Sequence, residues 1–588
     1  MSTVYPLVMG REVMLATEHY LSAAAGARIF ARGGNAIDAA VAATFVEGVV
    51  NPHMHTIGGE APMLIYSASA RRVVAINGNM IAPARATIEH YRSLGLKLVP
   101  HSGLLAAGVP AAFDALVTAL SEFGTMSLAE VLEPALMLAD AGFPMHVGLA
   151  GEILDASNSQ YAGAGASIRT FAKKFLSEWP SSARVYMPDG EVPKVGTVIK
   201  NPALARFFKR LLDAETSAKN RGREAALKAA SERFYRGDIA AEIVEWSDAN
   251  GGLLQASDLA AFETRIETPV SADYRGTTVH KCGPWSQGPV FLQQLKILEG
   301  FDLSSMGHNS ADYIHTVAET AKLAFADREA YYADPEFVEV PIDALVSKKY
   351  ADLRRALIDA KRASMDQRPG DPIAMRPLRS GGVEARAWGG GTVHVTACDR
   401  AGNMIAVTAS GGWIPSSPVM EALGFPLGSR MQTFFLDEKH PNALKPGKRP
   451  RTTLSPSLAM RGDQPYLAFG TPGGDQQDQW TLQFFLNVID FGMTLQQAIE
   501  APKFSSAHFP STFYPHNARP GVLRIEDRVD EKVRTQLAAR GHEIELRPPW
   551  SEGHVLAVEL DSDRGLLRGG CDPRGQAVPS MPAATIGW

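Results

Sequence analysis

Apolar residues in the first half of the chain recur mostly at helical spacing, with short β-branched runs between them. The most apolar tract, residues 35–50, contains Asp38 and Glu47 and falls short of the ~20 apolar residues that cross a bilayer. It predicts a buried helix with Asn35 as its N-cap, paired with an Ala-rich helix that begins near His19. The pattern also predicts strands at 63–66 and 72–76 and helices at 111–120, 128–140 and 311–332.

The pattern changes in the second half of the chain. Residues 360–391 are rich in Pro, Gly and Arg without a clear period, which is typical of a linker. The runs VHVTAC and MIAVTAS follow, joined by the turn DRAGN, and predict a β-hairpin in the middle of a sheet. A strand at 466–470, a TPGG turn and a helix at 479–491 come next. The chain is therefore of mixed α/β class.

One charged and alanine-rich segment, residues 216–236, predicts a helix on the surface with its polar residues in solvent, rather than a binding stripe. No internal repeat of 20 to 50 residues is evident, so repeat architectures are not indicated.

Length and composition limit the functions to consider. The 588 residues exceed the roughly 250 to 300 of an ordinary single core, so either several domains or one large layered body is expected. A net charge of -5 offers no basic field, which excludes nucleic acid as the expected partner. The start of the chain lacks the basic and apolar regions of a secretory signal, so we expect a cytoplasmic protein without a membrane partner. The three cysteines, Cys282, Cys398 and Cys571, form no CxxC pair and suit a reducing compartment.

Several common catalytic motifs are missing from the sequence. It has no G-x-S-x-G elbow, no H-E-x-x-H helix and no P-loop. His53 and His55 would point the same way on a strand, but a metal needs further ligands that the sequence does not supply. We interpret both as structural or positioning histidines, and we expect neither a metal nor another cofactor.

The run Gly389-Gly390-Gly391 before Thr392 suggests chemistry. A strained glycine linkage lets the threonine hydroxyl attack the preceding carbonyl in an N-to-O acyl shift, and hydrolysis of the ester would free Thr392 as a new N-terminus. The α-amine of such a residue, with an ordinary pKa of ~7.7 to 8, can accept the hydroxyl proton at neutral pH. The alternative is an ordinary glycine-rich loop entering a strand.

A resemblance that extends over nearly the whole chain favours the catalytic interpretation. The stretches that carry it are GGNAIDAAVAATFVEGVVNPHMHTIGGEAPMLIY (33–66), GVPAAFDAL (108–116), AETAKLAFADREAYYADPEF (318–337), GTVHVTACDRAGNMIAVTAS (391–410), LSPSLAM (454–460) and GTPGGDQQDQWTLQFFLNVIDFGMTLQQAIEAPKF (470–504). In this order they resemble the γ-glutamyltransferase family of N-terminal-nucleophile hydrolases, which cut themselves before a threonine. The resemblance implies a four-layer αββα sandwich, formed by residues 1–391 with the linker 360–391 and by residues 392–588.

The resemblance also implies roles for particular residues. Cleavage falls between Gly391 and Thr392, and Thr392 becomes the nucleophile. Thr408 and Ser410 match family hydroxyls near it, and we expect Ser410 to hydrogen-bond the hydroxyl or amine of Thr392. Further matches are the amides of Gly473 and Gly474, for the oxyanion hole, and the side chains of Thr452 and Thr453, for the substrate pocket. Taken singly, each hydroxyl is equally compatible with an ordinary strand or loop residue.

The chain departs from the family where a glutamyl group would be recognised. Asn79 stands where the resemblance implies an arginine clamp for the substrate α-carboxylate. Gln432 and Thr433 stand where a carboxylate would hold the α-ammonium, and Gly412 replaces an asparagine. Arg430 could supply a new carboxylate anchor, or it could form a salt bridge instead.

These observations predict an amidohydrolase that transfers an acyl group to Thr392 and then to water. The expected substrate is a small non-glutamyl amide such as oxamate, for which a family member exists, or a larger acyl amide. One alternative is a γ-glutamyl hydrolase or transpeptidase acting on glutathione-like substrates. The other is an uncleaved homologue that binds a ligand without catalysis. After cleavage, the two segments would form a heterodimer that could dimerise further.

Overall fold

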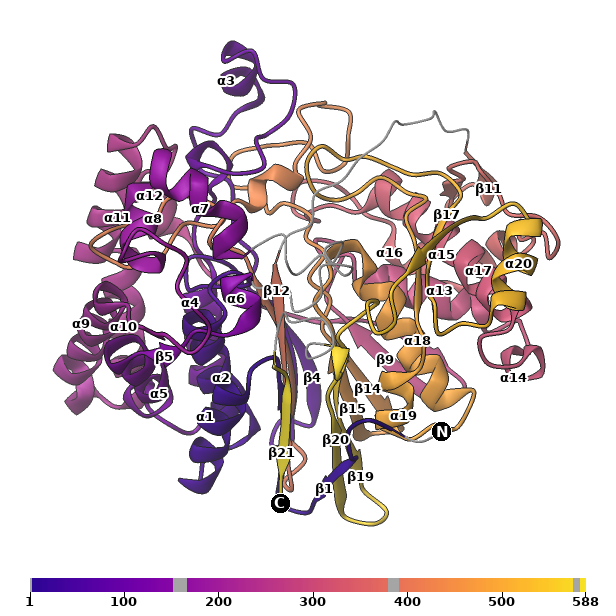
Figure 1. Cartoon of the computed structure of the whole chain (residues 1–588), viewed down its shortest axis with the longest axis horizontal. Coiled ribbons are helices and arrows are strands. Elements are labelled where there is room, and N and C mark those ends of the chain that lie inside the picture. Colours follow the sequence, from indigo (N-terminus) through magenta and orange to yellow (C-terminus); the bar gives the residue numbers. More distant parts are fainter. Residues whose placement is uncertain (1–2, 152–166, 379–390, 575–581) are drawn as a thin grey trace.

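Two β-sheets face each other in the middle of the molecule, with helices covering the outer face of each sheet (Figure 1). The computed structural model describes residues 3–151, 167–378, 391–574 and 582–588. Separate apolar clusters fill the space between the sheets and the space beneath each helical layer. The four-layer αββα arrangement implied by the resemblance is therefore confirmed.

Among the described residues, both sheets have seven strands, and every pairing within them is antiparallel. In spatial order, the first sheet consists of β21 (Ala584–Gly587), β2 (Val13–Thr17), β12 (Thr392–Asp399), β13 (Met404–Ser410), β3 (Met63–Ser67), β4 (Arg72–Asn77) and β7 (Arg265–Glu267). The second sheet consists of β1 (Val8–Gly10), β20 (Leu566–Gly570), β19 (Leu556–Asp561), β15 (Gln464–Gly470), β14 (Ser457–Arg461), β9 (Thr277–Lys281) and β8 (Val270–Tyr274). Each sheet thus takes strands from before and after Thr392.

The predicted hairpin VHVTAC/MIAVTAS is confirmed as β12 and β13, at the centre of the first sheet. All of its residues from Thr392 to Asp399 and from Met404 to Ser410 are buried. Alternate side chains enter the helix-covered core and the space between the sheets, so the hairpin is covered on both faces. In β12 the polar residues His394 and Thr396 still alternate with apolar ones, and each forms a hydrogen bond to β13, with the Thr408 hydroxyl and the Ile405 carbonyl respectively.

The predicted helix after Asn35 is α2 (Ala36–Val50), and it packs against both α1 (Tyr20–Ala31) and the central hairpin. The Asn35 side chain accepts hydrogen bonds from the amides of Ile37 and Asp38, at 2.9 and 3.0 Å. In return, the Asp38 carboxylate accepts the Asn35 amide at 2.9 Å, which completes a capping box. The cap signal in the sequence therefore located this helix correctly.

The other helices fall into two groups (Figure 1). The group over the first sheet includes α4 (Ala112–Phe123), α5 (Leu128–Ala141), α9 (Pro202–Ala218), α10 (Arg223–Tyr235) and α11 (Asp238–Ala249). The group over the second sheet includes α13 (Pro289–Leu298), α15 (Ala311–Tyr331), α17 (Lys348–Arg355), α18 (Gln477–Ile489) and α19 (Leu495–Glu500).

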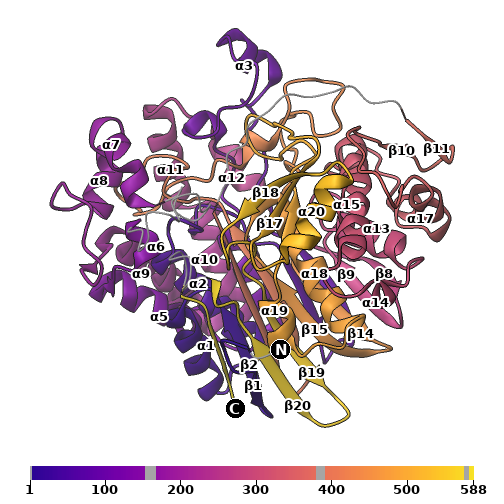
Figure 2. The ribbon, with the colours of Figure 1, turned by 45° about the vertical axis from the view of Figure 1, so that its right-hand side comes forward.

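A smaller three-stranded sheet lies against α15 together with α20 (Glu531–Ala539) (Figure 2). Its strands are β16 (Phe504–Ser506), β17 (Val522–Glu526) and β18 (Glu543–Arg547), and β17 pairs with β18 in parallel. The two chain ends lie at one end of the large sheets (Figures 1 and 2), where the amide of Arg11 donates to the Trp588 carbonyl at 2.8 Å.

The prediction of one continuous helix over residues 216–236 is wrong, although the polar side chains of the segment are exposed or half-buried as expected. The segment breaks at Gly222, whose φ of 99° lies outside the helical region, and a new helix, α10, begins at the next residue. Leu227 and Phe234 of α10 are fully buried in the core beneath the first sheet. The alanine-rich composition concealed a helix boundary and a core face.

The predicted linker is partly structured. Residues Gly370–Asp371 (β10) and Arg376–Pro377 (β11) form a short hairpin. The Gly370 amide donates to Asp327 of α15 at 2.8 Å, and the Gly370 carbonyl accepts the Tyr331 hydroxyl at 2.8 Å. Gly389 and Gly390 lie outside the described residues.

The three cysteines are buried and free, and no helix in the described ranges is both long and apolar enough to span a membrane.

Candidate active site

Thr392 and Ser410 are directly opposite each other at one end of the central hairpin. Thr392 is the first residue of β12, Ser410 is the last residue of β13, and the two are paired in the antiparallel register. Thr392 is 2% exposed and Ser410 is fully buried. The short turn DRAGN fixes this register, so the local sequence brings the two hydroxyls together.

The Ser410 hydroxyl connects the groups around the Gly391–Thr392 bond. It donates a hydrogen bond to the Gly391 carbonyl oxygen at 2.6 Å. The Thr392 Oγ1 lies 3.4 Å from Ser410 Oγ, and Arg430 Nη2 donates to the same oxygen at 2.7 Å. A hydrogen bond to a carbonyl oxygen stabilises negative charge that develops there during attack on the carbonyl carbon. Ser410 is therefore placed to assist attack by Thr392 on the preceding peptide bond.

A buried ion pair between Arg430 and Glu60 fixes the guanidinium that hydrogen-bonds Ser410. The guanidinium of Arg430 hydrogen-bonds the Glu60 carboxylate, and both side chains are at most 1% exposed. Burial raises the pKa of Glu60, although the adjacent Arg430 opposes that shift. The rings of Trp413 and Phe513 lie 5.2 and 5.4 Å from the guanidinium carbon. Arg430 is thus a fixed donor to Ser410.

The position of Arg430 bears on its predicted role as a carboxylate anchor. Its Nε and Nη2 are occupied by Glu60 and Ser410, whereas its buried Nη1 has no hydrogen-bond partner among the described residues. The salt bridge considered in the sequence therefore exists, and the anchor stays a prediction that rests on Nη1. Glu60 was missed, and the only signal was a lone carboxylate within the apolar run GGEAPMLIY.

Gly391 packs so closely that a side chain has no room. A Cβ there would lie 2.6 Å from both the His53 carbonyl oxygen and the Met54 Cα. Because both are backbone atoms, the segment would have to shift to accept any larger residue. The glycine before Thr392 is therefore required for the geometry of this junction.

The two histidines near this junction have separate environments. The Nδ1 of His55 lies 3.3 Å from the Ser410 carbonyl oxygen, and burial lowers the pKa of His55 to about 4. The His53 ring faces that of His146, with 5.5 Å between the centroids. This geometry matches the predicted structural or positioning roles.

Thr408 contacts His394, whereas Ser410 contacts Gly391 and Thr392. Its hydroxyl lies 3.0 Å from Nδ1 of His394, the residue opposite it in the hairpin. Burial lowers the pKa of His394 to about 3, so this ring is neutral at pH 7. Of the two predicted hydroxyls, Ser410 thus contacts Thr392, while Thr408 orients His394 two residues further along the strand.

The Gly473–Gly474 turn follows β15, which faces β12 across the space between the sheets. A Cβ at Gly470, the last residue of β15, would overlap the His394 ring, so the turn lies near the start of β12. The φ angles of Gly473 and Gly474 are 124° and 60°, which favour glycine. The role of these two amides as an oxyanion hole stays a prediction.

Thr452 pairs with the segment 285–287, which in turn contacts the Gly473–Gly474 turn. The Thr452 amide donates to the Trp285 carbonyl, and the Thr452 carbonyl accepts the Gln287 amide, both at 2.9 Å. The Gln287 side chain in turn donates to the Gly474 carbonyl at 3.3 Å. The buried Thr453 hydroxyl has no hydrogen-bond partner in the part of the chain that the structure describes.

The residues that replace the glutamyl-recognition groups are buried and uncharged. Asn79 donates to the Pro450 carbonyl at 2.6 Å, which ties it to the segment before Thr452. Gln432 donates to Ser429 at 3.4 Å, and the Thr433 hydroxyl donates to the Arg430 carbonyl at 3.0 Å. Gln432 and Thr433 therefore belong to the same short helical turn as Arg430, Arg430–Thr433.

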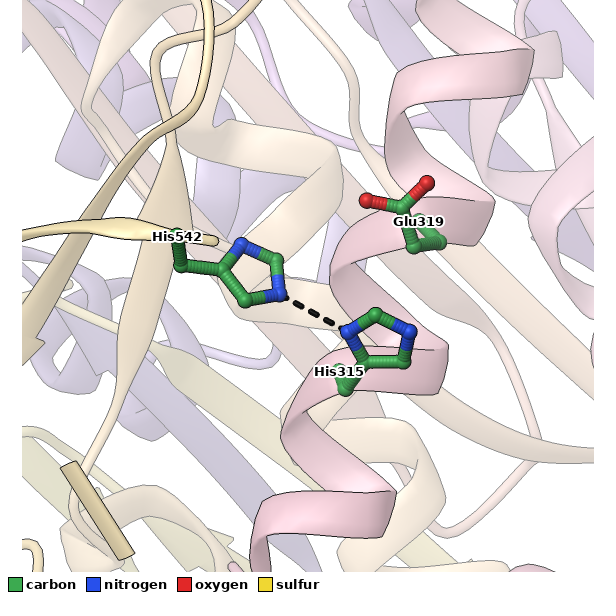
Figure 3. A group of neighbouring side chains, drawn as sticks. All are labelled: His315, Glu319 and His542. Atoms are coloured by element: carbon green, nitrogen blue, oxygen red, sulfur yellow. Dashed lines mark hydrogen bonds between the residues drawn. The ribbon is translucent and has the colours of Figure 1, made fainter. Parts of the chain in front are cut away.

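One group of described residues, distant in sequence from Thr392, has the spacing of metal ligands. His315 and Glu319 of α15 and His542 place one ligand atom each within 4.8 Å of one another (Figure 3). The two rings are hydrogen-bonded to each other at 2.9 Å, and His315 Nε2 also lies 2.7 Å from the Asp359 carbonyl oxygen.

The charges around this group disfavour a cation. The Glu319 carboxylate already accepts hydrogen bonds from Lys322, at 2.6 Å, and from Arg368, at 2.8 Å. A metal ion would add a third positive charge beside these two. We interpret the group as a structural network that connects α15 to the strand after His542.

Two antiparallel sheets between helical layers, with a glycine–threonine bond at the start of a central strand, define an N-terminal-nucleophile hydrolase. The gamma-glutamyltranspeptidase family model matches residues 22–581. The chain belongs to this family and is an enzyme, a self-processing amidohydrolase of the N-terminal threonine type.

Its relatives include both hydrolases and acylases. The chain is 32% identical to the glutathione hydrolase-like YwrD proenzyme of Bacillus subtilis, over 97% of this chain and 98% of the relative. It is 33% identical to the acylase ACY 1 proenzyme of Pseudomonas sp. strain SE83, over 97% and 93% of the two chains. A solved structure of cephalosporin acylase from Bacillus halodurans superposes with a TM-score of 0.82, at 28% identity, covering 100% of this chain and 98% of that one.

Proposed function

We propose that the chain cleaves itself before Thr392 and then hydrolyses an acyl amide that is not a glutamyl compound. The observation that carries self-cleavage is the hydrogen bond from Ser410 to the carbonyl oxygen of Gly391, beside the Thr392 hydroxyl. The neutral residues Asn79, Gln432 and Thr433 support the choice of substrate class, since none can form an ion pair with an α-amino acid head.

Self-cleavage begins with attack of Thr392 Oγ1 on the Gly391 carbonyl carbon. The negative charge moves to the carbonyl oxygen, where Ser410 donates and Arg430 fixes the orientation of Ser410. The C–N bond then breaks, the amine keeps the proton that the hydroxyl loses, and an ester joins Gly391 to Thr392. Water hydrolyses the ester, which leaves a Gly391 carboxylate and a free Thr392 amine.

The freed amine serves as the base in the second reaction. It takes the proton of the Thr392 hydroxyl while the oxygen attacks the substrate carbonyl, and it returns that proton to the leaving amine. The amides of Gly473 and Gly474 would hold the oxyanion. Water then releases the acyl group from Thr392 and restores the hydroxyl. Segments 1–391 and 392–588 would remain together as a heterodimer.

Intact mass analysis under denaturing conditions tests self-cleavage. We expect fragments corresponding to residues 1–391 and 392–588 from the wild type and from Thr392→Ser, which keeps a hydroxyl, and one full-length species from Thr392→Ala. A full-length wild type that never matures would instead support the uncleaved binding homologue.

The relative named a glutathione hydrolase-like proenzyme supports a second candidate, a γ-glutamyl hydrolase with substitute recognition residues. Release of glutamate from glutathione, compared with release of acid from acyl anilides and from oxamate by the same cleaved preparation, distinguishes the two. Turnover of glutathione with higher kcat/KM than any acyl amide would overturn the proposed substrate class.

A further inference from the structure

A cavity of about 450 Å³ lies between α15 and two loops that lead from the candidate active site. Ala326 and Ala330 line it from α15, Phe435 and His440 from the first loop, and His516 from the second. Its volume is within the range of sites that hold drug-sized molecules. None of the residues with predicted catalytic or substrate-binding roles lines it.

Three connections join this cavity to the site around Thr392. The first loop begins directly after the Arg430–Thr433 turn, so Phe435 is five residues from the guanidinium that holds Ser410. Arg451, next to Thr452, donates to Glu329 in the cavity wall at 2.9 Å. A side chain next to the predicted substrate-pocket residues Thr452 and Thr453 therefore reaches the cavity wall.

The second loop forms the third connection. Phe513 packs against Gly474, because a Cβ on that glycine would lie 2.9 Å from the ring. The His516 amide donates to the Phe513 carbonyl at 2.8 Å, so a tight turn carries the chain from the glycine turn to the cavity. Asp475 holds this loop by accepting the Thr512 amide at 3.0 Å.

The loop is also anchored to α15. Arg328 contacts Asp475 at 2.5 Å and the Pro510 carbonyl at 2.8 Å, and the same guanidinium hydrogen-bonds Gln287 at 3.0 Å. Since Gln287 donates to the Gly474 carbonyl, the cavity wall and the predicted oxyanion turn belong to one hydrogen-bonded unit.

The described lining of the cavity is mainly apolar, includes stacked rings and is electrically balanced. The Phe435 ring is stacked between His440, at 3.6 Å, and His516, at 4.1 Å, with interplanar angles of 18° and 21°. Burial lowers the pKa of His440 to about 4 and also lowers that of His516, so both rings are neutral at pH 7.

Glu329, the carboxylate in the described part of the lining, is compensated. Although burial opposes ionisation, Arg451 and Arg328 hold the pKa of Glu329 at about 2, so its charge is matched by these two guanidinium groups. A charged ligand would gain no ion pair here and would lose its hydration, whereas a flat apolar group would gain burial against the apolar and ring atoms of the lining.

We propose that this cavity binds a neutral aromatic ring on the acyl side of the substrate, so that the enzyme prefers arylacyl amides over small polar ones. This inference rests on the proposed amidohydrolase function. It narrows the proposed substrate class to larger acyl amides rather than small polar amides such as oxamate.

Two substrates with one leaving group test the proposal: phenylacetyl p-nitroanilide and acetyl p-nitroanilide. We expect wild-type kcat/KM to be at least about tenfold higher for the phenylacetyl compound, since burial of a ring provides more than that. Ala330→Leu, which fills the cavity, and Phe435→Ala, which removes the stack, should each abolish this preference, measured as the ratio of the two kcat/KM values within one variant. Phe123→Ala, a partly buried phenylalanine on α4, is the matched control and should keep the preference.

A binding measurement keeps the proposal testable when turnover is low. Ligand-observed NMR should detect 2-phenylethanol, a neutral probe that cannot be hydrolysed, bound to the wild type, cleaved or not, and to Phe123→Ala, and at least about fivefold weaker binding to Ala330→Leu. No binding to the wild type, or equal binding to Ala330→Leu, overturns the cavity proposal.

The two proposals fail in distinguishable ways. Absence of the two fragments in the intact mass spectrum contradicts self-cleavage and leaves the binding result to decide the cavity. Cleaved protein that hydrolyses acetyl and phenylacetyl amides equally keeps the amidohydrolase and overturns the aryl site.

Discussion

Ser410 donates a hydrogen bond of 2.6 Å to the carbonyl oxygen of Gly391, the residue whose peptide bond is expected to break. The contact exists in the uncleaved chain, so the donor is in place before the oxygen acquires charge. Such preorganised donors lower a barrier without any reorganisation during the reaction.

Removing this donor should slow maturation. In Ser410→Ala, loss of one oxyanion donor predicts cleavage before Thr392 that is about 10² to 10³ slower than in the wild type. The fraction of full-length chain, followed by denaturing mass spectrometry after synthesis, measures this rate. Ser410→Thr keeps a hydroxyl and should mature faster than the alanine variant. Wild-type maturation of Ser410→Ala would exclude the role given to this hydroxyl.

The Arg430–Glu60 pair should show strong energetic coupling. Arg430→Met leaves a carboxylate buried without its partner and is expected to lower the free energy of unfolding by about 3 to 5 kcal/mol. Arg430→Met/Glu60→Met removes both charges and should recover most of the loss. Urea unfolding in a Thr392→Ala background, where every protein is one uncut chain, makes the comparison. Additive losses would mean that the pair is not coupled.

Gly474 allows maturation to be separated from catalysis. In Gly474→Ala, a Cβ would meet the Phe513 ring at 2.9 Å with φ at 60°, so the predicted oxyanion amide should be displaced. We expect kcat to fall by about 10² to 10³ on the best amide substrate while both fragments still form. Gly492→Ala is the control, because Gly492 has a similar φ of 63° but nothing within 4 Å of the added Cβ. Equal kcat for the two variants would refute the role of the Gly474 amide.

The His315–His542 pair predicts a loss of stability in acid. Burial lowers the pKa of His542 to about 3, and Lys322, His508 and Arg540 add to this effect. The unfolded chain, with an ordinary histidine pKa near ~6.5, binds a proton that the folded protein does not, so stability falls as pH decreases below 6.5. At pH 5 the depressed pKa of His542 lowers the free energy of unfolding by about 2 kcal/mol, compared with a histidine whose pKa is the same in both states. In the Thr392→Ala background, His542→Gln should show a smaller drop in urea midpoint between pH 7 and 5, and an unchanged drop would contradict the assignment.

The sequence was most informative where a local signal determines the structure. Asn35 and Asp38 form the capping box at the start of α2. A short polar turn between two β-strand patterns defines the central hairpin and hence the pairing of Thr392 with Ser410. Local composition failed at Gly222, where alanine-rich sequence continued across a helix boundary. Gly222 itself was the overlooked signal, because glycine is about 1 kcal/mol less favourable than alanine inside a helix and readily adopts a positive φ.

Long-range contacts were beyond local reasoning. Glu60 and Arg430 are separated by 370 positions, and only the folded sheet brings the carboxylate to the guanidinium. The cavity beside α15 is equally nonlocal, because Phe435 and His516 acquire their stacked arrangement from two loops that have no common sequence pattern. The family resemblance identified the hydroxyl and glycine positions around Thr392. It did not predict the Glu60–Arg430 pair or the stacking of Phe435 with His516.

Both sheets interleave strands from before and after Thr392. This interleaving limits how the cleaved protein could refold. β2 lies between β21 and β12, and β20 lies between β1 and β19, so neither segment has a complete sheet of its own. Once the chain is cut, the two pieces would hold together for as long as the sheets last, but their ends would no longer be tethered. Refolding of the cleaved protein would require the two unfolded segments to meet in solution, in competition with their aggregation. The mature enzyme would therefore be folded only once, and its useful lifetime would be set by the rate at which it first unfolds.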